Sequence, residues 1–160
     1  MELRQARTAL FIVALAFAVG FLGDYYLIPQ VKWMLYARAE PDAAANVDLI
    51  ARLIAAEAQG EPYEGMVGVG AVIMNRTNDP KFPGTIPGVI YEPWAFESVS
   101  NGLIWQRTPT WTERRAAIDA VSGWDPVYGA KFFWNPAKPV SGWIWTRIIV
   151  RQIGNHVFAL

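Results

Sequence analysis

The stretch from Tyr63 to Arg76 is the part of the sequence that most restricts the fold. Its apolar side chains recur at helical spacing, and Gly68 and Gly70 lie among them. Glycine at such positions leaves backbone free for the close approach of a neighbouring element. The stretch therefore predicts a buried central helix around which the other elements pack.

Another helix is expected before this one. Between residues 49 and 57 the apolar side chains and one carboxylate, Glu57, recur at three- and four-residue spacings, the pattern of one helix face. Asn46 is suited to cap its N-terminus, and Gly60 and Pro62 are suited to end it.

The second half of the chain predicts one more helix and then a small sheet. Thr110 and Glu113 have the spacing of a capping box, at the start of a helix that Gly123 can end. Three later segments are rich in β-branched and aromatic residues and predict short strands: 130–134, 148–153 and 156–159. Helices first and strands last predict an α+β domain with a small C-terminal antiparallel sheet. The turn-rich stretch 78–88 predicts a loop with at most one short helical turn.

The N-terminal residues have the pattern of a membrane segment. Arg4 and Arg7 precede a mostly apolar stretch up to Ile28, which is about the 20 residues that a spanning helix needs. We expect residues 1–30 to form one N-terminal transmembrane helix or a signal segment, 31–45 a linker, and 46–160 one folded domain. Because basic residues stay on the cytoplasmic side, that domain would be exported.

Two alternatives to an uncleaved membrane anchor stay open. Residues 37–39 have the small-x-small form of a signal-peptide cleavage site. The apolar stretch could also be a buried helix of a soluble protein.

Charge and residue usage exclude several classes of function. The chain has 14 basic and 14 acidic residues, so it lacks the basic surface on which nucleic-acid binding depends. It has no cysteine and a single histidine, His156, which excludes thiolate metal sites and zinc sites with several histidine ligands. We therefore expect no metal and no cofactor.

Glu57 is the strongest candidate for catalysis. Helical spacing places it on the stripe of Ile50, Leu53 and Ile54, where a carboxyl group is out of place. Burial against apolar neighbours raises the pKa of a carboxyl group, which is what a general acid working near neutral pH requires. A helix-end position, an ion pair with an arginine or simple exposure would explain the residue equally well. Glu61 is a weaker candidate because Pro62 interrupts the helix.

Aromatic residues are concentrated in the second half of the chain, and flat aromatic faces can stack on sugar rings. For any single ring a place in the core is the ordinary alternative, so only the group indicates a carbohydrate site. The candidate substrate-binding residues are Phe96, Tyr128, Trp134, Trp143 and His156.

At these residues the sequence resembles the SleB/CwlJ family of cell wall hydrolases. The matching pieces are, in order, residues 56–65, 71–76, 82–83, 89–91, 96, 123–126, 133–136, 143–145 and 153–158. The resemblance implies a compact, lysozyme-like catalytic domain over residues 46–160 and places the family's catalytic glutamate on Glu57. Members of the family have been described both as lytic transglycosylases and as N-acetylmuramoyl-L-alanine amidases.

The function that the resemblance implies is cleavage of peptidoglycan glycan strands. A lytic transglycosylase would use Glu57 to protonate the oxygen between N-acetylmuramic acid and N-acetylglucosamine, and then to accept the proton of the muramic C6 hydroxyl as an anhydro ring closes. The domain would face the periplasm or cell wall from a bacterial inner or cytoplasmic membrane. The alternatives are an amidase and a membrane-tethered peptidoglycan-binding module without activity.

Overall fold

The computed structural model describes residues 41–160. The membrane or signal segment expected in residues 1–30 and residues 31–40 of the expected linker lie outside the described residues. Over 41–160, none of the helices has the length and apolar character to cross a membrane.

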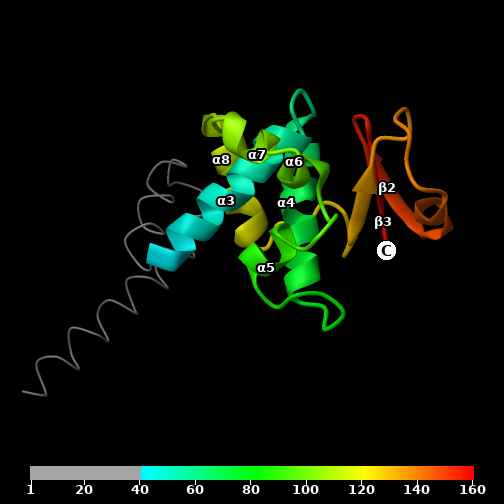
Figure 1. The fold of residues 1–160 in the computed structure, drawn as a ribbon, viewed down its shortest axis with the longest axis horizontal. Coiled ribbons are helices and arrows are strands. Elements are labelled where there is room, and N and C mark those ends of the chain that lie inside the picture. Colours follow the sequence, from blue (N-terminus) through cyan, green and yellow to red (C-terminus); the bar gives the residue numbers. More distant parts are fainter. Residues whose placement is uncertain (1–40) are drawn as a thin grey trace, which may run out of the picture. The chain divides into compact units, whose positions relative to one another are not determined.

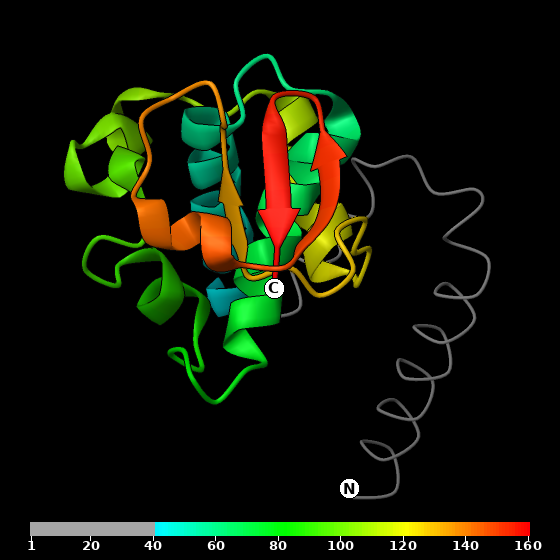
Figure 2. The same ribbon diagram turned by 90° about the vertical axis from the view of Figure 1, so that its right-hand side faces the viewer.

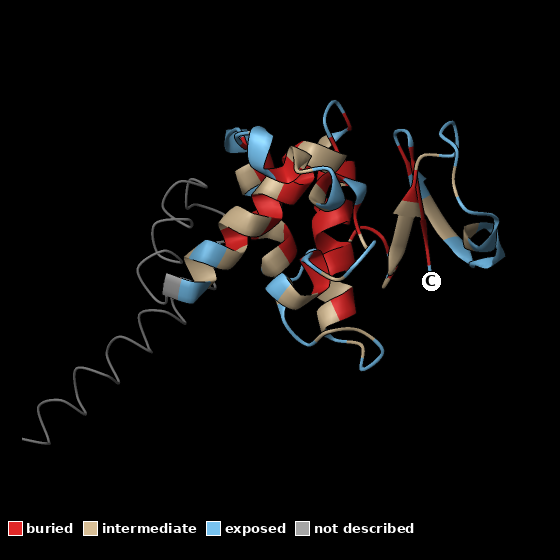
Figure 3. Ribbon diagram, in the orientation of Figure 1, coloured by how far each residue is buried: buried red, intermediate tan, exposed pale blue. Residues whose placement is uncertain are grey.

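Three helices form the main body of the domain (Figure 1): α3 (Pro41–Glu57), α4 (Tyr63–Thr77) and α8 (Trp111–Val121). Helix α4 is buried along most of its length (Figure 3). A side-chain carbon on Gly70 would lie 2.8 Å from the Cβ of Ala120 in α8, and one on Gly68 would lie 3.0 Å from the ring of Phe158. The two glycines thus let α8 and the sheet approach α4 from different sides, which confirms the predicted central helix.

The ends of the other two helices follow from local sequence. Helix α8 begins with the predicted capping box, because the Thr110 hydroxyl accepts from the first turn and the Glu113 carboxylate accepts from the Thr110 backbone N–H. Helix α3 already includes Pro41, so Asn46 lies inside it and the expectation that Asn46 caps it is wrong.

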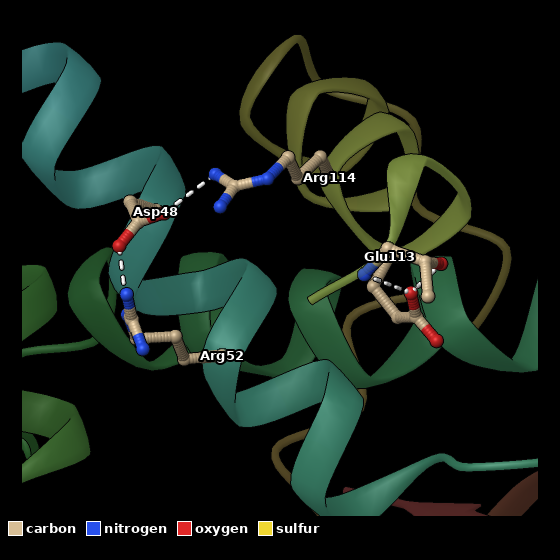
Figure 4. A network of polar contacts seen from close by, with 5 residues as sticks. Asp48, Arg52, Glu113 and Arg114 are labelled. Carbon is tan, nitrogen blue, oxygen red and sulfur yellow. Dashed lines mark hydrogen bonds and ion pairs between the residues drawn. The ribbon is translucent and has the colours of Figure 1, made fainter. Parts of the chain in front are cut away.

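An ion-pair network joins α3 to α8 (Figure 4). The Asp48 carboxylate accepts from Arg52 at 2.8 Å within α3 and from Arg114 of α8 at 2.5 Å. Although burial acts to raise it, the two guanidinium groups hold the pKa of Asp48 below its usual range. Asp48 therefore links the N-terminal half of α3 to α8.

Short helices occupy the chain between α4 and α8: α5 (Ile86–Ile90), α6 (Glu97–Ser100) and α7 (Leu103–Gln106). Helix α5 begins within the stretch 78–88, for which a loop with at most one short helical turn is predicted, and Thr85 caps it by accepting from the Gly88 N–H. The other two were not predicted. Helices of a single turn show no recurrence of apolar residues, so periodicity cannot reveal them.

The three predicted strands form one antiparallel sheet in the order β1-β3-β2. They are β1 (Phe132–Trp134), β2 (Ile149–Ile153) and β3 (His156–Ala159), with the 3₁₀ helix η1 (Gly142–Thr146) between β1 and β2. Figure 2 shows β3 between its two partners. Phe133 pairs with Phe158, and Ile153 pairs with His156 across the Gly154-Asn155 turn. All four residues of β3 are buried, as expected for the middle strand.

Candidate active site

Glu57 is the last residue of α3, and its side chain is half-buried. Its Oε1 accepts a hydrogen bond of 3.2 Å from the backbone N–H of Ser98, which lies 41 residues further along the chain in α6. Over the described residues it forms no ion pair, and Arg52 of the same helix pairs with Asp48. The carboxyl group is thus held through one oxygen only.

Glu61 lies four residues after Glu57, the last residue of α3, and is buried. Its Oε2 accepts from the backbone N–H of Asn155 and its Oε1 from the Asn155 side-chain amide, each at 2.9 Å. A side-chain carbon on Gly154 would collide with Glu61 Oε2, and Gly154 has φ +57, so both the space and the backbone conformation of this turn require glycine. Both oxygens of Glu61 are therefore engaged in fixing the β2–β3 turn.

His156 follows that turn directly and is buried. Burial lowers its pKa, and the nearby carboxylates of Glu61 and Glu57 oppose this effect without reversing it. The imidazole is consequently neutral near pH 7. Its Nδ1 is buried without a hydrogen-bond partner in the described part of the chain, and its ring packs against Phe133 with centroids 5.3 Å apart.

A group of aromatic rings extends from His156 to Arg76. Phe133 contacts Phe96 with centroids 6.2 Å apart, and Phe96 is buried immediately before α6. The Arg76 guanidinium lies 5.1 Å from the Phe96 ring and 5.6 Å from that of Phe132. Burial lowers the pKa of Arg76 to about 10, and its Nε donates to the Lys131 carbonyl at 2.8 Å. These contacts join α4, α6 and β1 around the site.

The remaining candidate residues differ in how far the structure exposes them to solvent. Trp143 is half-exposed in η1, with its ring edge-on to Phe132 at 5.6 Å. Trp134 is 5% exposed in a small core cluster and leaves little indole surface for a ligand. Tyr128 is exposed on the loop before β1, beneath the Arg151 guanidinium at 5.7 Å. Phe96 and His156 are linked to each other through the ring of Phe133, which contacts both.

Several residues of the site have no counterpart among the sequence candidates. Ser98, Asn155, Phe133 and Arg76 all contribute, and Ser98 also buries a hydroxyl that lacks a partner in the described structure. Their partners are far away in the sequence, so no local spacing reveals them.

Residues 41–160 contain no group of three histidine, aspartate or glutamate side chains that could hold a metal ion.

The arrangement around Glu57 is suited to proton transfer. One carboxyl oxygen receives a backbone N–H, and the other has no hydrogen-bond partner within 41–160. His156 lies near enough for the charges of Glu57 and Glu61 to act on its pKa, while both oxygens of the Glu61 carboxylate accept from Asn155. A single carboxyl group can therefore donate a proton to a substrate and take one back.

Comparison with known proteins gives consistent matches. The model of the Cell Wall Hydrolase family matches residues 60–159, which begin just after Glu57. A spore cortex-lytic enzyme of Oceanobacillus iheyensis is 50% identical over 113 residues, which are 71% of this chain and 41% of that protein. Cell wall hydrolase CwlJ of Bacillus subtilis is 36% identical, over 72% of this chain and 84% of that protein.

A solved structure extends the likeness to three dimensions. The catalytic domain of the germination-specific lytic transglycosylase SleB from Bacillus anthracis superposes with a TM-score of 0.68 at 43% identity, over 72% of this chain and 93% of that domain. The chain spans about two fifths of the length of the spore cortex-lytic relative from Oceanobacillus iheyensis.

Proposed function

Since the chain belongs to the SleB/CwlJ family of cell wall hydrolases, we propose that it cleaves peptidoglycan as a lytic transglycosylase with Glu57 as acid and base. The observation that carries this proposal is the contrast between two carboxyl groups. Within residues 41–160, Glu57 has one oxygen without a hydrogen-bond partner, whereas both oxygens of Glu61 accept from Asn155.

Glycosidases that use water normally need two carboxyl groups, one as acid and one as base or nucleophile. Here Glu57 acts alone. It protonates the glycosidic oxygen as the bond to the muramic C1 breaks, and it then accepts the proton of the C6 hydroxyl as O6 bonds to C1. The proton returns to Glu57, no water is consumed, and the product ends in an anhydro-muramic ring.

Aromatic residues at the surface would bind the glycan. The exposed rings of Trp143 and Tyr128 can stack on pyranose rings. His156, Phe96 and Trp134 are buried, and they would act by packing the elements that carry the site.

The decisive variant is Glu57→Gln, with Glu64→Gln as its matched control. Glutamine keeps the shape and the bond from Ser98 but cannot transfer the proton, so release of soluble fragments from purified sacculi by the full-length chain should fall about 10²- to 10⁴-fold. Glu64 pairs with Arg151 at the surface, and its variant should stay close to wild type. Activity of Glu57→Gln within about threefold of wild type would contradict the assignment.

Mass spectrometry of the products distinguishes the bond that is cut. Anhydro-muramic ends formed in the presence of a chelator support the transglycosylase. Reducing ends would indicate hydrolysis, and free stem peptides with loss of activity in chelator would indicate an amidase. Binding to sacculi without any release would indicate a non-catalytic module.

We also propose that the N-terminal segment holds the domain outside the cytoplasm, as Arg4 and Arg7 predict. A periplasmic reporter fused after Leu160 should then be active and a cytoplasmic reporter inactive. The opposite result would show that the domain is not exported.

A further inference from the structure

Two residues other than glycine have a left-handed backbone in the described chain, and both are exposed aromatics. Trp94 has φ 67 and is 90% exposed, and Tyr128 has φ 54 and is 67% exposed. This conformation is unfavourable for bulky side chains, and glycine adopts it without strain. Strain of this kind is found mainly where a residue has a function.

The packing of the domain does not account for Trp94. Its indole takes part in none of the ring pairs or cation–π contacts of residues 41–160, in contrast to Tyr128, which lies beneath Arg151. Neighbouring Tyr91 and Trp105 stack on each other, with centroids 6.5 Å apart and an interplanar angle of 16°. A side chain that is 90% exposed buries almost no apolar surface, so its presence stabilises the fold little.

Trp94 lies close to the candidate active site along the chain. Its turn is closed by the bond from the Ala95 N–H to the Glu92 carbonyl at 3.1 Å, and it leads into Phe96 and then Ser98, which holds Glu57. Four residues of chain reach at most about 14 Å. The backbone of Trp94 therefore lies within about 14 Å of Ser98, the residue that donates to Glu57.

We propose that Trp94 is a binding platform for peptidoglycan, on which a pyranose ring of the strand stacks outside the point of cleavage. The proposal rests on the proposed function and adds a contact for long strands. An indole presents a wide apolar face with a polar N–H, which suits a sugar ring with C–H groups on one side and hydroxyls at its edge.

The charges around Trp94 favour a glycan over a lipid surface. Glu92 and Glu97 lie on either side of it, and residues 91–97 contain no lysine or arginine. Segments that bind membrane surfaces combine aromatic residues with basic ones, because the lipid headgroups are anionic. Carboxylates beside the indole would be repelled by such a surface, whereas a glycan strand tolerates them.

The test uses three variants of the full-length chain. Trp94→Gly removes the indole and relieves the backbone, and Trp94→Ala removes the indole alone. Trp111→Ala is the matched control, because Trp111 is an exposed tryptophan on the ordinary helical backbone of α8. Affinity is measured by co-sedimentation with purified sacculi on ice, and KM and kcat are measured on long glycan strands and on a tetrasaccharide.

Both Trp94 variants should bind sacculi about 2- to 12-fold more weakly, the range expected for loss of one aromatic stacking contact. The KM for long strands should rise by a similar factor, with kcat and the tetrasaccharide KM unchanged. Trp94→Gly should unfold at or above the wild-type temperature, and Trp111→Ala should bind like wild type.

Three results would overturn the proposal: unchanged binding, a lower unfolding temperature for Trp94→Gly, or lost binding to anionic phospholipid vesicles with unchanged binding to sacculi. Release of soluble fragments tests the proposed function separately from the affinity that tests Trp94. If the wild-type chain binds sacculi but releases nothing, the catalytic assignment fails, while the difference in affinity still decides the role of Trp94.

Discussion

Replacing Glu61 by alanine should damage the active site without touching the group that transfers the proton. Asn155 donates two hydrogen bonds to the Glu61 carboxylate, and these hold the β2–β3 turn. His156 follows that turn directly. We therefore regard Glu61 as a positioning residue for His156 and expect its loss to change stability and turnover together.

The magnitude follows from the two bonds that are lost. Hydrogen bonds to a charged group contribute about 1.5–3 kcal/mol each when they are buried. Asn155 is exposed, so water replaces part of what its donors lose. We expect Glu61→Ala to lower the free energy of unfolding by about 1–3 kcal/mol, which is roughly 4–12 °C in midpoint for a domain of this size. Glu61→Gln keeps one acceptor and should lie between alanine and wild type.

The assay combines thermal unfolding with turnover of sacculi across pH. Glu64→Ala is the control, because it breaks a half-exposed ion pair with Arg151 that should contribute less than about 1 kcal/mol. Glu61 acts to raise the pKa of His156, so its removal should also move any pH dependence that His156 imposes to lower pH. A Glu61→Ala variant that unfolds like the control, with unchanged turnover and pH profile, would refute this reasoning.

Two further predictions concern stability. Burial lowers the pKa of His156 below the unfolded value of 6.5, so the free energy of unfolding should be fully retained above about pH 6.5 and should fall below it as the unfolded chain takes up the proton. His156 is the only histidine, so chemical denaturation of His156→Gln should show a flatter dependence between pH 5.5 and 6.5, and an unchanged slope would contradict the burial argument. Gly68→Ala should destabilise the fold by about 1–3 kcal/mol, because the new carbon would lie 2.9 Å from Val127 Cγ1. Gly142→Ala, where the new carbon meets nothing within 4 Å, should stay within about 0.5 kcal/mol of wild type; equal effects of the two would show that α4 is not closely packed.

The elements that could be predicted from the sequence are those with a local signal. The glycines within α4, the capping box of α8 and the Gly154-Asn155 turn each depend on residues close together in the chain. Helical spacing also selected Glu57. Its partner Ser98 lies 41 residues away, and the partner of Glu61 lies 94 residues away, so only the folded chain brings these groups together.

At Asn46 the local signal gave a wrong prediction. Asparagine is a good N-cap, but residues 41–45 before it are also compatible with a helix, and α3 includes them. Trp134 shows that residue type alone does not separate a binding surface from a core, since its neighbours in space decide its exposure. Tertiary contacts thus determine which of several locally acceptable interpretations is realised.

The strand order has a consequence for the timing of folding. Within residues 41–160 both outer strands pair with β3 alone, and β3 is made after them, so neither β1 nor β2 has its strand partner while β3 is still unmade. The helices form from nearby residues and can assemble early, whereas sheet pairing must wait. His156 is the first residue of β3. A nascent chain therefore acquires the complete candidate site only after β3 has been made and has paired with both outer strands.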